Sequence, residues 1–269
     1  MRPRFPGLWV AGSLAGLERT TVAVVGARAP SDAARARAEQ LSEALARAGV
    51  CVVSGLALGI DGAAHRGALT GGGPTIGVLG GGHRCFFPQR NRALAAEMIA
   101  AGGAVLSPFD PDHPAYPSQF LQRNGVVAAL ADAVVVVEAA ERSGALNTAS
   151  WAADLSVDVL AYPGDVDRPK AAGCNALIRD GATLVRGPDD VLEALGMKPA
   201  SDGATRAAND ASFSPLERRI LALLAKGPRD IDGIAKDGEP VAAIAAALVT
   251  LELAGAVLRD VDAATYRRA

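Results

Sequence analysis

Short, uniformly apolar runs alternate with alanine-rich runs of helical period from residue 21 to residue 195. The apolar runs, such as AVVVVEA at 133–139, lack alternating polar positions, which is typical of strands covered on both faces of a sheet. Strand–helix alternation of this kind predicts an α/β fold with a doubly wound, mostly parallel sheet. The predicted strands are 21–26, 50–55, 75–81, 103–108, 132–139, 157–164 and 182–187. A helix is predicted at 31–48, with Ser31 as N-cap and Gly49 as its stop.

The pattern changes after this region. Residues 196–212 are small and polar without a hydrophobic period, which indicates a linker between a core at 1–195 and a second domain at 213–269. In that second domain, Ser214 and Pro215 open a helix of regular apolar spacing. A short helix, a third helix ending at Gly255 and a two-stranded wing follow, which together predict a winged helix-turn-helix.

Composition narrows the classes of protein only a little. The 269 residues carry a formal net charge of −2, so a nucleic acid would have to be met by a local cluster of cations. Cys51, Cys85 and Cys174 are isolated, and a reduced core thiol is expected for Cys51. The apolar run at the N-terminus is too broken for a signal peptide or a membrane span, so a cytoplasmic protein is expected.

Glycine and polar residues collect where the predicted strands end. Ligands of a doubly wound sheet bind beyond the carboxyl ends of its strands. Glycines there permit close backbone approach, and the helices that follow direct amide groups at an anion. We therefore predict a phosphate-accepting rim, to which Arg28 adds a guanidinium. Its segments are 26–28, 54–61, 80–82 with 87–91, 138–144 and 163–164.

Other interpretations of single residues stay open. Asp61 is equally compatible with an acid that stabilises the start of a helix, and His65 with a buried histidine whose hydrogen bonds are satisfied. His83 and His113 have no partner at metal-ligand spacing, so no metal is expected. The chain has neither a G-x-G-x-x-G after the first strand nor a G-x-x-x-x-G-K-[ST], which disfavours common dinucleotide binding and P-loop ATP hydrolysis.

Taken in order, the strand ends resemble the DNA-processing protein A family, also called DprA or Smf. The resemblance rests on seven ordered segments from about residue 8 to 195: VAVVGAR, VVSGLALGIDGAAHRGAL, TIGVLGGG with FFPQRN, FLQRNGVVAAL, VVVVEAAERSGALNTA, AYPG and GCNALIRDGA. The tail, with LELAGAV and Tyr266, is similar to the winged-helix domain of that family.

This resemblance implies an extended Rossmann-like core that binds single-stranded DNA, protects it and helps to load the RecA recombinase in natural transformation. It also implies a homodimer formed through the core, no cofactor and no catalytic activity. Many members have a further N-terminal helical domain, which we expect to be missing because this chain begins almost at the core. The apolar residues near 107–116 are a candidate for the dimer surface.

Residue by residue, the resemblance assigns several positions to the DNA site. Phe87 and Phe120 offer faces for base stacking, and Arg28, Arg123 and Arg90 supply cations. The full set of expected DNA-binding residues is Arg28, Ser54, Gly55, Gly59, Asp61, Phe87, Arg90, Phe120, Arg123, Asn124, Ser143 and Gly144; His65, Glu138, Thr148, Gly173, Asn175 and Gly181 also match family motifs.

Two departures from the family pattern each remove a cation. Gly125 stands where the family has a second arginine after Asn124, and Gln89 stands where a lysine is frequent. Because affinity scales with the number of neutralised phosphates, we expect a weaker or shifted DNA contact. The tail does not compensate, since residues 213–269 hold eight Lys/Arg and eight Asp/Glu, and the third helix has no cation. We expect that helix to pack or to contact protein, so DNA binding is assigned to the core.

Two rival functions use the same strand-end pocket. One is hydrolysis of nucleotide N-glycosidic bonds, as in Rossmann-like proteins of the lonely-guy type, with Glu138 and Arg142 around a nucleoside monophosphate; the expected P-G-G-x-G-T-x-x-E signature is absent, since Asp165 follows Pro163-Gly164. The other is a nucleotide-sensing regulator whose winged helix signals to a partner. Competition between nucleotides and DNA distinguishes both from the DNA-binding hypothesis.

Overall fold

The computed structural model of the chain describes residues 7–197, 213–224, 227–235, 240–254, 256–260 and 265–268. It divides into two compact units, Met1–Ala200 and Ser201–Ala269, which are described separately. Most of the predicted linker, 198–212, lies outside the described residues.

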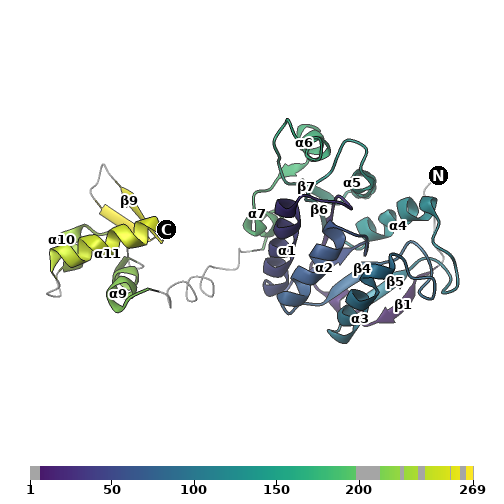
Figure 1. Cartoon of the computed structure of the whole chain (residues 1–269), viewed down its shortest axis with the longest axis horizontal. Helices are drawn as coiled ribbons and strands as arrows, with labels where there is room; N and C mark the ends of the chain where they lie inside the picture. Colours follow the sequence, from purple (N-terminus) through teal and green to yellow (C-terminus); the bar gives the residue numbers. More distant parts are fainter. Residues whose placement is uncertain are drawn as a thin grey trace. The chain divides into compact units, whose positions relative to one another are not determined.

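An eight-stranded sheet forms the first unit, in the order β1-β5-β4-β3-β2-β6-β7-β8 (Figure 1). All pairs are parallel except that of β1 with β5. The fold class expected from the apolar runs is therefore confirmed. The strands are β1 (Trp9–Gly12), β2 (Thr21–Val25), β3 (Cys51–Ser54), β4 (Thr75–Val78), β5 (Ala104–Ser107), β6 (Ala133–Val136), β7 (Asp158–Ala161) and β8 (Thr183–Leu184).

Strand β1 was not predicted from the sequence. It is a four-residue edge strand that pairs antiparallel with β5, Trp9 opposite Ser107 and Gly12 opposite Ala104. Gly12 has φ +105, and a Cβ there would lie 2.3 Å from the carbonyl oxygen of Gly103, so only glycine fits this close approach. The apolar run around β1 is short and broken, and none of the four strand residues is buried, so the uniformly apolar pattern that marks the inner strands is missing here.

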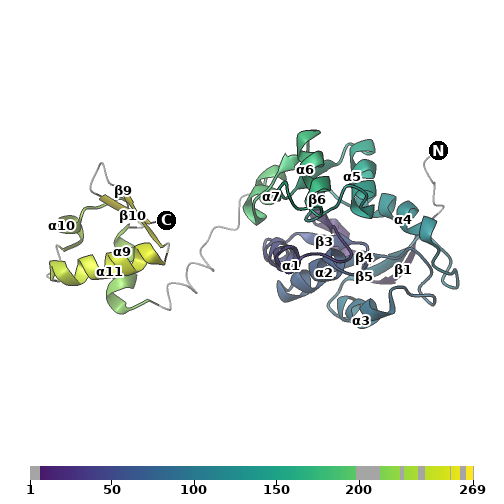
Figure 2. The same ribbon diagram turned by 45° about the horizontal axis from the view of Figure 1, so that its top comes forward.

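Helices cover both faces of the sheet (Figure 2). α1 (Asp32–Arg47), α2 (Ile60–Thr70), α3 (Arg92–Ala100) and α7 (Pro188–Ala194) pack on one face, and α4 (Pro117–Ala129), α5 (Gly144–Asp154) and α6 (Ala172–Arg179) pack on the other. Successive residues of β2 serve the two cores in turn, with Val22 and Val24 in one and Ala23 and Val25 in the other. Two 3₁₀ helices, η1 (Ala15–Glu18) and η2 (Gln89–Asn91), complete this unit.

The predicted start and end of α1 are confirmed. Ser31 is its N-cap, and the Ser31 hydroxyl accepts a hydrogen bond from the amide of Ala34 at 3.2 Å. Gly49 follows the helix with φ +85. This helix begins directly beyond the carboxyl end of β2, so its capped N-terminus lies at the edge of the sheet where ligands of this fold bind.

Two of the three cysteines are core residues. Cys51, in β3, is fully buried, and its burial raises the pKa of the thiol to about 12. Cys174, in α6, is buried against the other end of the sheet, where burial raises the pKa of its thiol to about 11. The core-thiol prediction for Cys51 is therefore confirmed.

The second unit has the elements predicted for a winged helix. α9 (Pro215–Leu224), α10 (Ile231–Ile234) and α11 (Val241–Leu253) precede the antiparallel pair β9 (Val257–Asp260) and β10 (Thr265–Arg268). Its own core gathers Ile220, Leu224, Ile244, Leu248 and Leu251. Among the described residues of the chain, no helix combines the length and apolar character needed to cross a lipid bilayer.

Candidate functional site

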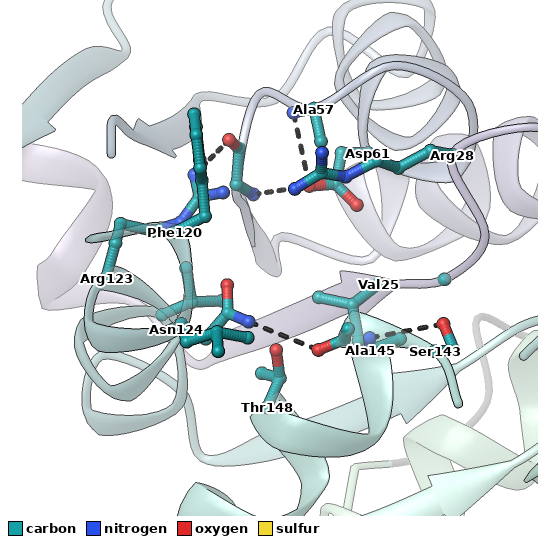
Figure 3. A pocket seen from close by; sticks show the side chains of 15 residues that line it. Val25, Arg28, Ala57, Asp61, Phe120, Arg123, Asn124, Ser143, Ala145 and Thr148 are labelled. Atoms are coloured by element: carbon teal, nitrogen blue, oxygen red, sulfur yellow. Dashed lines mark hydrogen bonds between the residues drawn. The ribbon is translucent and has the colours of Figure 1, made fainter. Parts of the chain in front are cut away.

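The site lies where the strand order reverses. β2 and β6 are neighbours at the centre of the sheet, and the chain leaves them toward opposite faces, which opens a crevice beyond their carboxyl ends. A cavity of about 110 Å³, which we call the switch-point cavity, occupies this position (Figure 3). It is lined by Val25, Gly26, Arg28, Gly55, Ala57, Asp61, Phe120, Leu121, Arg123, Asn124, Val127, Ser143, Gly144, Ala145 and Thr148.

The floor of this cavity contains a buried arginine. Arg123 extends from α4 and is 3% exposed. Its Nη1 donates hydrogen bonds to the carbonyl oxygens of Gly55 and Val78, at the ends of β3 and β4. Gly55 lies flat against the guanidinium, since a Cβ at this position would be 2.7 Å from its central carbon. Arg123 therefore ties α4 to the loops that follow two strands.

Asp61 completes the floor. Its Oδ2 accepts hydrogen bonds from the amides of Gly55 at 3.1 Å and Ala57 at 3.3 Å. Burial raises the pKa of Asp61, while the charge of Arg123 and the two amides act in the opposite direction. Burial also lowers the pKa of Arg123, to about 10, so its guanidinium is charged at neutral pH beside the Asp61 carboxyl.

The prediction of a phosphate-accepting rim at 54–61 is consequently wrong in one respect. The amides of Gly55 and Ala57, which the sequence offered to a phosphate, bind the chain's own carboxylate. Arg123 is likewise engaged by carbonyl oxygens and compensated by Asp61. This floor is already neutralised from within, so it has little to offer an incoming anion.

Ser54 and Gly59 support the site from behind. The hydroxyl of Ser54 is fully buried and donates to the carbonyl oxygen of Val24 at 2.7 Å, so it does not reach the cavity. Gly59 has φ +82, and a Cβ there would lie 2.3 Å from the carbonyl oxygen of Ala27. The expectation that these two residues contact DNA directly does not fit their positions. They hold the loop after β3 against the loop after β2.

His65 is a buried neutral residue. Its Nδ1 lies 2.7 Å from the hydroxyl of Thr75, which itself donates to the carbonyl oxygen of Val52, so Nδ1 is the donor of that pair. Burial lowers the pKa of His65 to about 3, and the nearby Arg123 acts in the same direction. Nε2 has no hydrogen-bond partner among the described residues. Of the two interpretations, the buried histidine holds, with one nitrogen satisfied.

The rim of the cavity differs from its floor. In Figure 3 the guanidinium of Arg28 extends from the loop after β2 toward the ring of Phe120 on α4, with its central carbon 5.3 Å from the ring centroid. The rings of Phe120 and Phe87 lie 5.9 Å apart, and Phe87 is 52% exposed. A second opening of about 320 Å³, which we call the aromatic hollow, is lined by Arg28, Phe87, Ala115, Pro117 and Phe120.

The opposite wall is the start of α5. Ser143 is its N-cap, and its hydroxyl accepts a hydrogen bond from the amide of Ala145 at 3.3 Å. The carbonyl oxygen of Gly144 accepts from Nδ2 of Asn124 at 3.2 Å, which joins α5 to α4 across the cavity (Figure 3). A Cβ at Gly144 would meet no atom within 4 Å, so open space surrounds this glycine. The positive end of the α5 dipole therefore faces the cavity without obstruction.

Comparison with known proteins identifies the family. The family model described as DNA recombination-mediator protein A matches residues 3–196, and the one described as DprA winged helix domain matches residues 204–262. The chain belongs to the DprA/Smf family. It is 38% identical to Protein Smf of Escherichia coli over 262 residues, which covers 93% of this chain and 69% of that protein.

Two solved DprA structures have the same fold. The X-ray structure of DprA from Streptococcus pneumoniae superposes with a TM-score of 0.64 at 39% identity, covering 69% of this chain and 65% of that one. DNA processing protein A from Helicobacter pylori, whose structure was described for its single-stranded DNA binding mode, gives a TM-score of 0.66 at 27% identity and covers 72% and 89%. This chain thus spans about two thirds of the length of several relatives it matches.

The structure shows the surroundings of the two residues, Gly125 and Gln89, that depart from the DprA pattern. Gly125 lies against Trp151 of α5, and a Cβ there would be 3.1 Å from the indole ring. Nε2 of the Gln89 side chain donates to the carbonyl oxygen of Phe86 at 2.8 Å. Arg90, beside it in η2, is exposed but lines neither the switch-point cavity nor the aromatic hollow. Neither missing cation is replaced by a neighbour that lines these two openings.

Sequence reasoning found Phe120, Arg123 and Asn124 but missed Val127, which a helical period would have found. Phe120, Arg123, Asn124 and Val127 are spaced i, i+3, i+4 and i+7 on α4, so they share the face that lines the cavity. The segment 107–116, a candidate for the dimer surface, contributes Ala115 to the aromatic hollow. The composition of this segment did not predict that Ala115 would line the hollow.

Proposed function

We propose that this DprA relative binds single-stranded DNA along the rim of the switch-point cavity. The observation that carries the proposal is Arg28, an exposed arginine between the cavity and the aromatic hollow. Among the described residues no carboxylate pairs with it, whereas exposed arginines elsewhere in the core form ion pairs. An exposed guanidinium that forms no ion pair and lies beside aromatic rings suits a phosphodiester with its bases.

In this proposal, different parts of the rim bind different parts of the DNA. Arg28 and the open start of α5 at Gly144 hold backbone phosphates, by charge and by helix dipole. Phe87 and Phe120 stack bases from the aromatic hollow. Such contacts tolerate any base sequence, because every base has a π-face and every nucleotide a phosphate. Asp61, Gly55 and Arg123 keep the floor in place, and we assign DNA contact to none of them.

Few cations face this strand, so a single site is expected to bind weakly. A homodimer that offers two such sites to one strand would gain affinity through effective concentration. Homodimer formation, protection of incoming DNA, loading of RecA and the absence of catalysis are proposed on the family resemblance alone. The winged-helix unit is proposed to contact protein, since α11 has no lysine or arginine.

The test is fluorescence anisotropy of labelled oligo(dT) and of a duplex of equal length, over a salt series. We expect the single strand to be preferred, with affinity falling as salt rises. Arg28→Ala should weaken single-strand binding about 10-fold at low salt, a loss of one charge-assisted contact, and should flatten the salt dependence by about 0.7 in log–log slope. The matched control is Arg47→Ala, which removes an exposed arginine paired with Glu43 in the last turn of α1.

The same experiment addresses the rival functions. Indifference of oligo(dT) binding to added thymidine monophosphate would argue against a nucleotide-sensing regulator and an N-glycosidase. The Glu138 carboxylate, a candidate for such chemistry, accepts hydrogen bonds from the amide and hydroxyl of Ser31 at 3.0 and 2.6 Å, so it caps α1. Absence of single-strand binding by the wild-type chain at low salt would overturn the proposed function.

A further inference from the structure

A second cavity lies on the other side of the loop that carries Arg28. It has a volume of about 280 Å³ and is formed by the start of α1, the ends of β6 and β7, and the start of α6. Ser31 and Arg37 line it from α1, Tyr162 from the end of β7, and Arg168 and Lys170 from the segment before α6. The mechanism proposed above uses none of these side chains.

Its cations form no ion pairs among the described residues. No carboxylate among the described residues forms an ion pair with Arg37, Arg168 or Lys170, although six arginines elsewhere in the core are paired. Arg37 lies over the ring of Tyr162, 5.1 Å from its centroid. The pairs found elsewhere are Arg35–Asp32, Arg47–Glu43, Arg66–Glu39, Arg84–Asp112, Arg179–Asp180 and Arg186–Asp190.

Two acids also line this cavity and have to be weighed. Glu138 directs both carboxylate oxygens at Ser31, where they take up the amide and the hydroxyl. Asp165 accepts a hydrogen bond from the amide of Asp167 at 3.1 Å, and together with Glu138 it sets two negative charges against three positive ones. The net charge of the residues around the opening is positive, and an aromatic side chain lies among them. Cations beside an aromatic ring are the groups that recognise a phosphate within a nucleic acid.

Only a thin wall separates this cavity from the switch-point cavity. Arg28 lines one and Ser31 the other, so the wall is the short segment 27–30, which spans at most about 14 Å when fully extended. It is pinned from the second side, because Nζ of Lys170 donates to the carbonyl oxygen of Ala29 at 2.7 Å. The amide of Ala27 donates to the carbonyl oxygen of Glu138 at 2.7 Å, which fixes its other end. A DNA strand bound at Arg28 would therefore have to pass over only this short, fixed segment to reach the second cavity.

We infer that the second cavity is a subsite for the phosphodiester backbone of the same DNA strand, reached across segment 27–30. The inference rests on the proposed function. A strand that occupies Arg28 and the aromatic hollow continues over the wall and places later phosphates on Arg168, Lys170 and Arg37. Short oligonucleotides then fill the rim alone, and longer ones fill both places.

The test measures the affinity of oligo(dT) of increasing length, from 4 to 20 nucleotides, for the whole chain. Arg168→Ala/Lys170→Ala should weaken binding of the shortest bound oligonucleotide much less than binding of the longest, since the loss of the Lys170 bond to Ala29 also loosens the loop of Arg28. It should weaken binding of the longest about 10-fold at low salt and reduce the log–log salt slope by about 1.4, for two lost phosphate contacts on a single strand. Arg179→Ala is the control, since this arginine is exposed on α6 and paired with Asp180.

Because Lys170 also holds the loop of Arg28, Arg168→Ala alone serves as the second variant. It should weaken binding only of the longer oligonucleotides, and the change in the log–log salt slope should be about half that of the double variant. An equal loss at every length in Arg168→Ala, or no loss at any length, would overturn the subsite. So would saturable binding of thymidine monophosphate that Arg168→Ala abolishes, which would assign the cavity to a free nucleotide. If the wild-type chain binds no oligonucleotide of any length, the proposed function itself has failed.

Discussion

The floor and the rim of the switch-point cavity each contain an arginine, yet the two arginines differ in burial and in the groups that their guanidinium contacts. Arg123 is buried, donates to two carbonyl oxygens and lies beside Asp61. Arg28 is exposed, lies over an aromatic ring and forms no ion pair among the described residues, although its charge, like that of Arg123, lowers the pKa of Asp61. A cation that lines a cavity can bind a phosphate only if it is exposed and its N–H groups are not already taken up by the protein, and by that criterion the rim alone qualifies.

The largest expected effect is on the stability of the floor. Arg123→Met should lower the free energy of unfolding by about 3–5 kcal/mol, because it leaves Asp61 buried without its main counter-charge. Urea denaturation measures this loss. Arg28→Ala, by contrast, should change stability by no more than about 0.5 kcal/mol, as is usual for an exposed side chain. If Arg123→Met were as stable as the wild type but no longer bound DNA, the distinction between floor and rim would be wrong.

Acid should also act on the buried histidine of α2. The pKa of His65 is about 3 in the folded chain and about 6.5 in the unfolded one, so the unfolded state binds a proton first as pH falls. Stability from this residue is complete above about pH 6.5 and is lost toward pH 3, by about 3 kcal/mol between pH 7 and pH 4. Denaturation of wild type and His65→Asn at several pH values checks it. An identical pH slope in the two proteins would remove His65 as the cause.

The smallest effect should come from the exposed ring of the aromatic hollow. Phe87→Ala should weaken binding of oligo(dT) by about 1–2 kcal/mol, the loss of roughly one stacked base, with little change in stability. Anisotropy and thermal unfolding measure the two quantities separately. Val249→Ala, an exposed apolar residue of the winged-helix unit, is the control. Equal affinity of Phe87→Ala and wild type would confine the site to the phosphate contacts of the rim.

The sequence predicted the sheet well because uniformly apolar strands carry a strong local signal. It also predicted that residues after several strands meet at one edge of the sheet, where they line the switch-point cavity. It did not predict which residues there remain free. Whether Asp61 turns back onto the amides of Gly55 and Ala57 depends on the backbone at Gly59, and Arg123 finds its carbonyl partners 45 and 68 residues earlier in the chain. Such pairings exist only in the folded chain.

The buried thiols described above have a practical consequence for spectroscopy of this protein. A thiol reagent attacks through the thiolate, and at neutral pH the sulfurs of Cys51 and Cys174 are protonated and enclosed in the core. Of the three cysteines, only Cys85 is partly exposed. Replacing Cys85 alone would therefore leave a chain that can take a single probe at any chosen surface position, while slow labelling of the two core sulfurs would report how often the sheet opens.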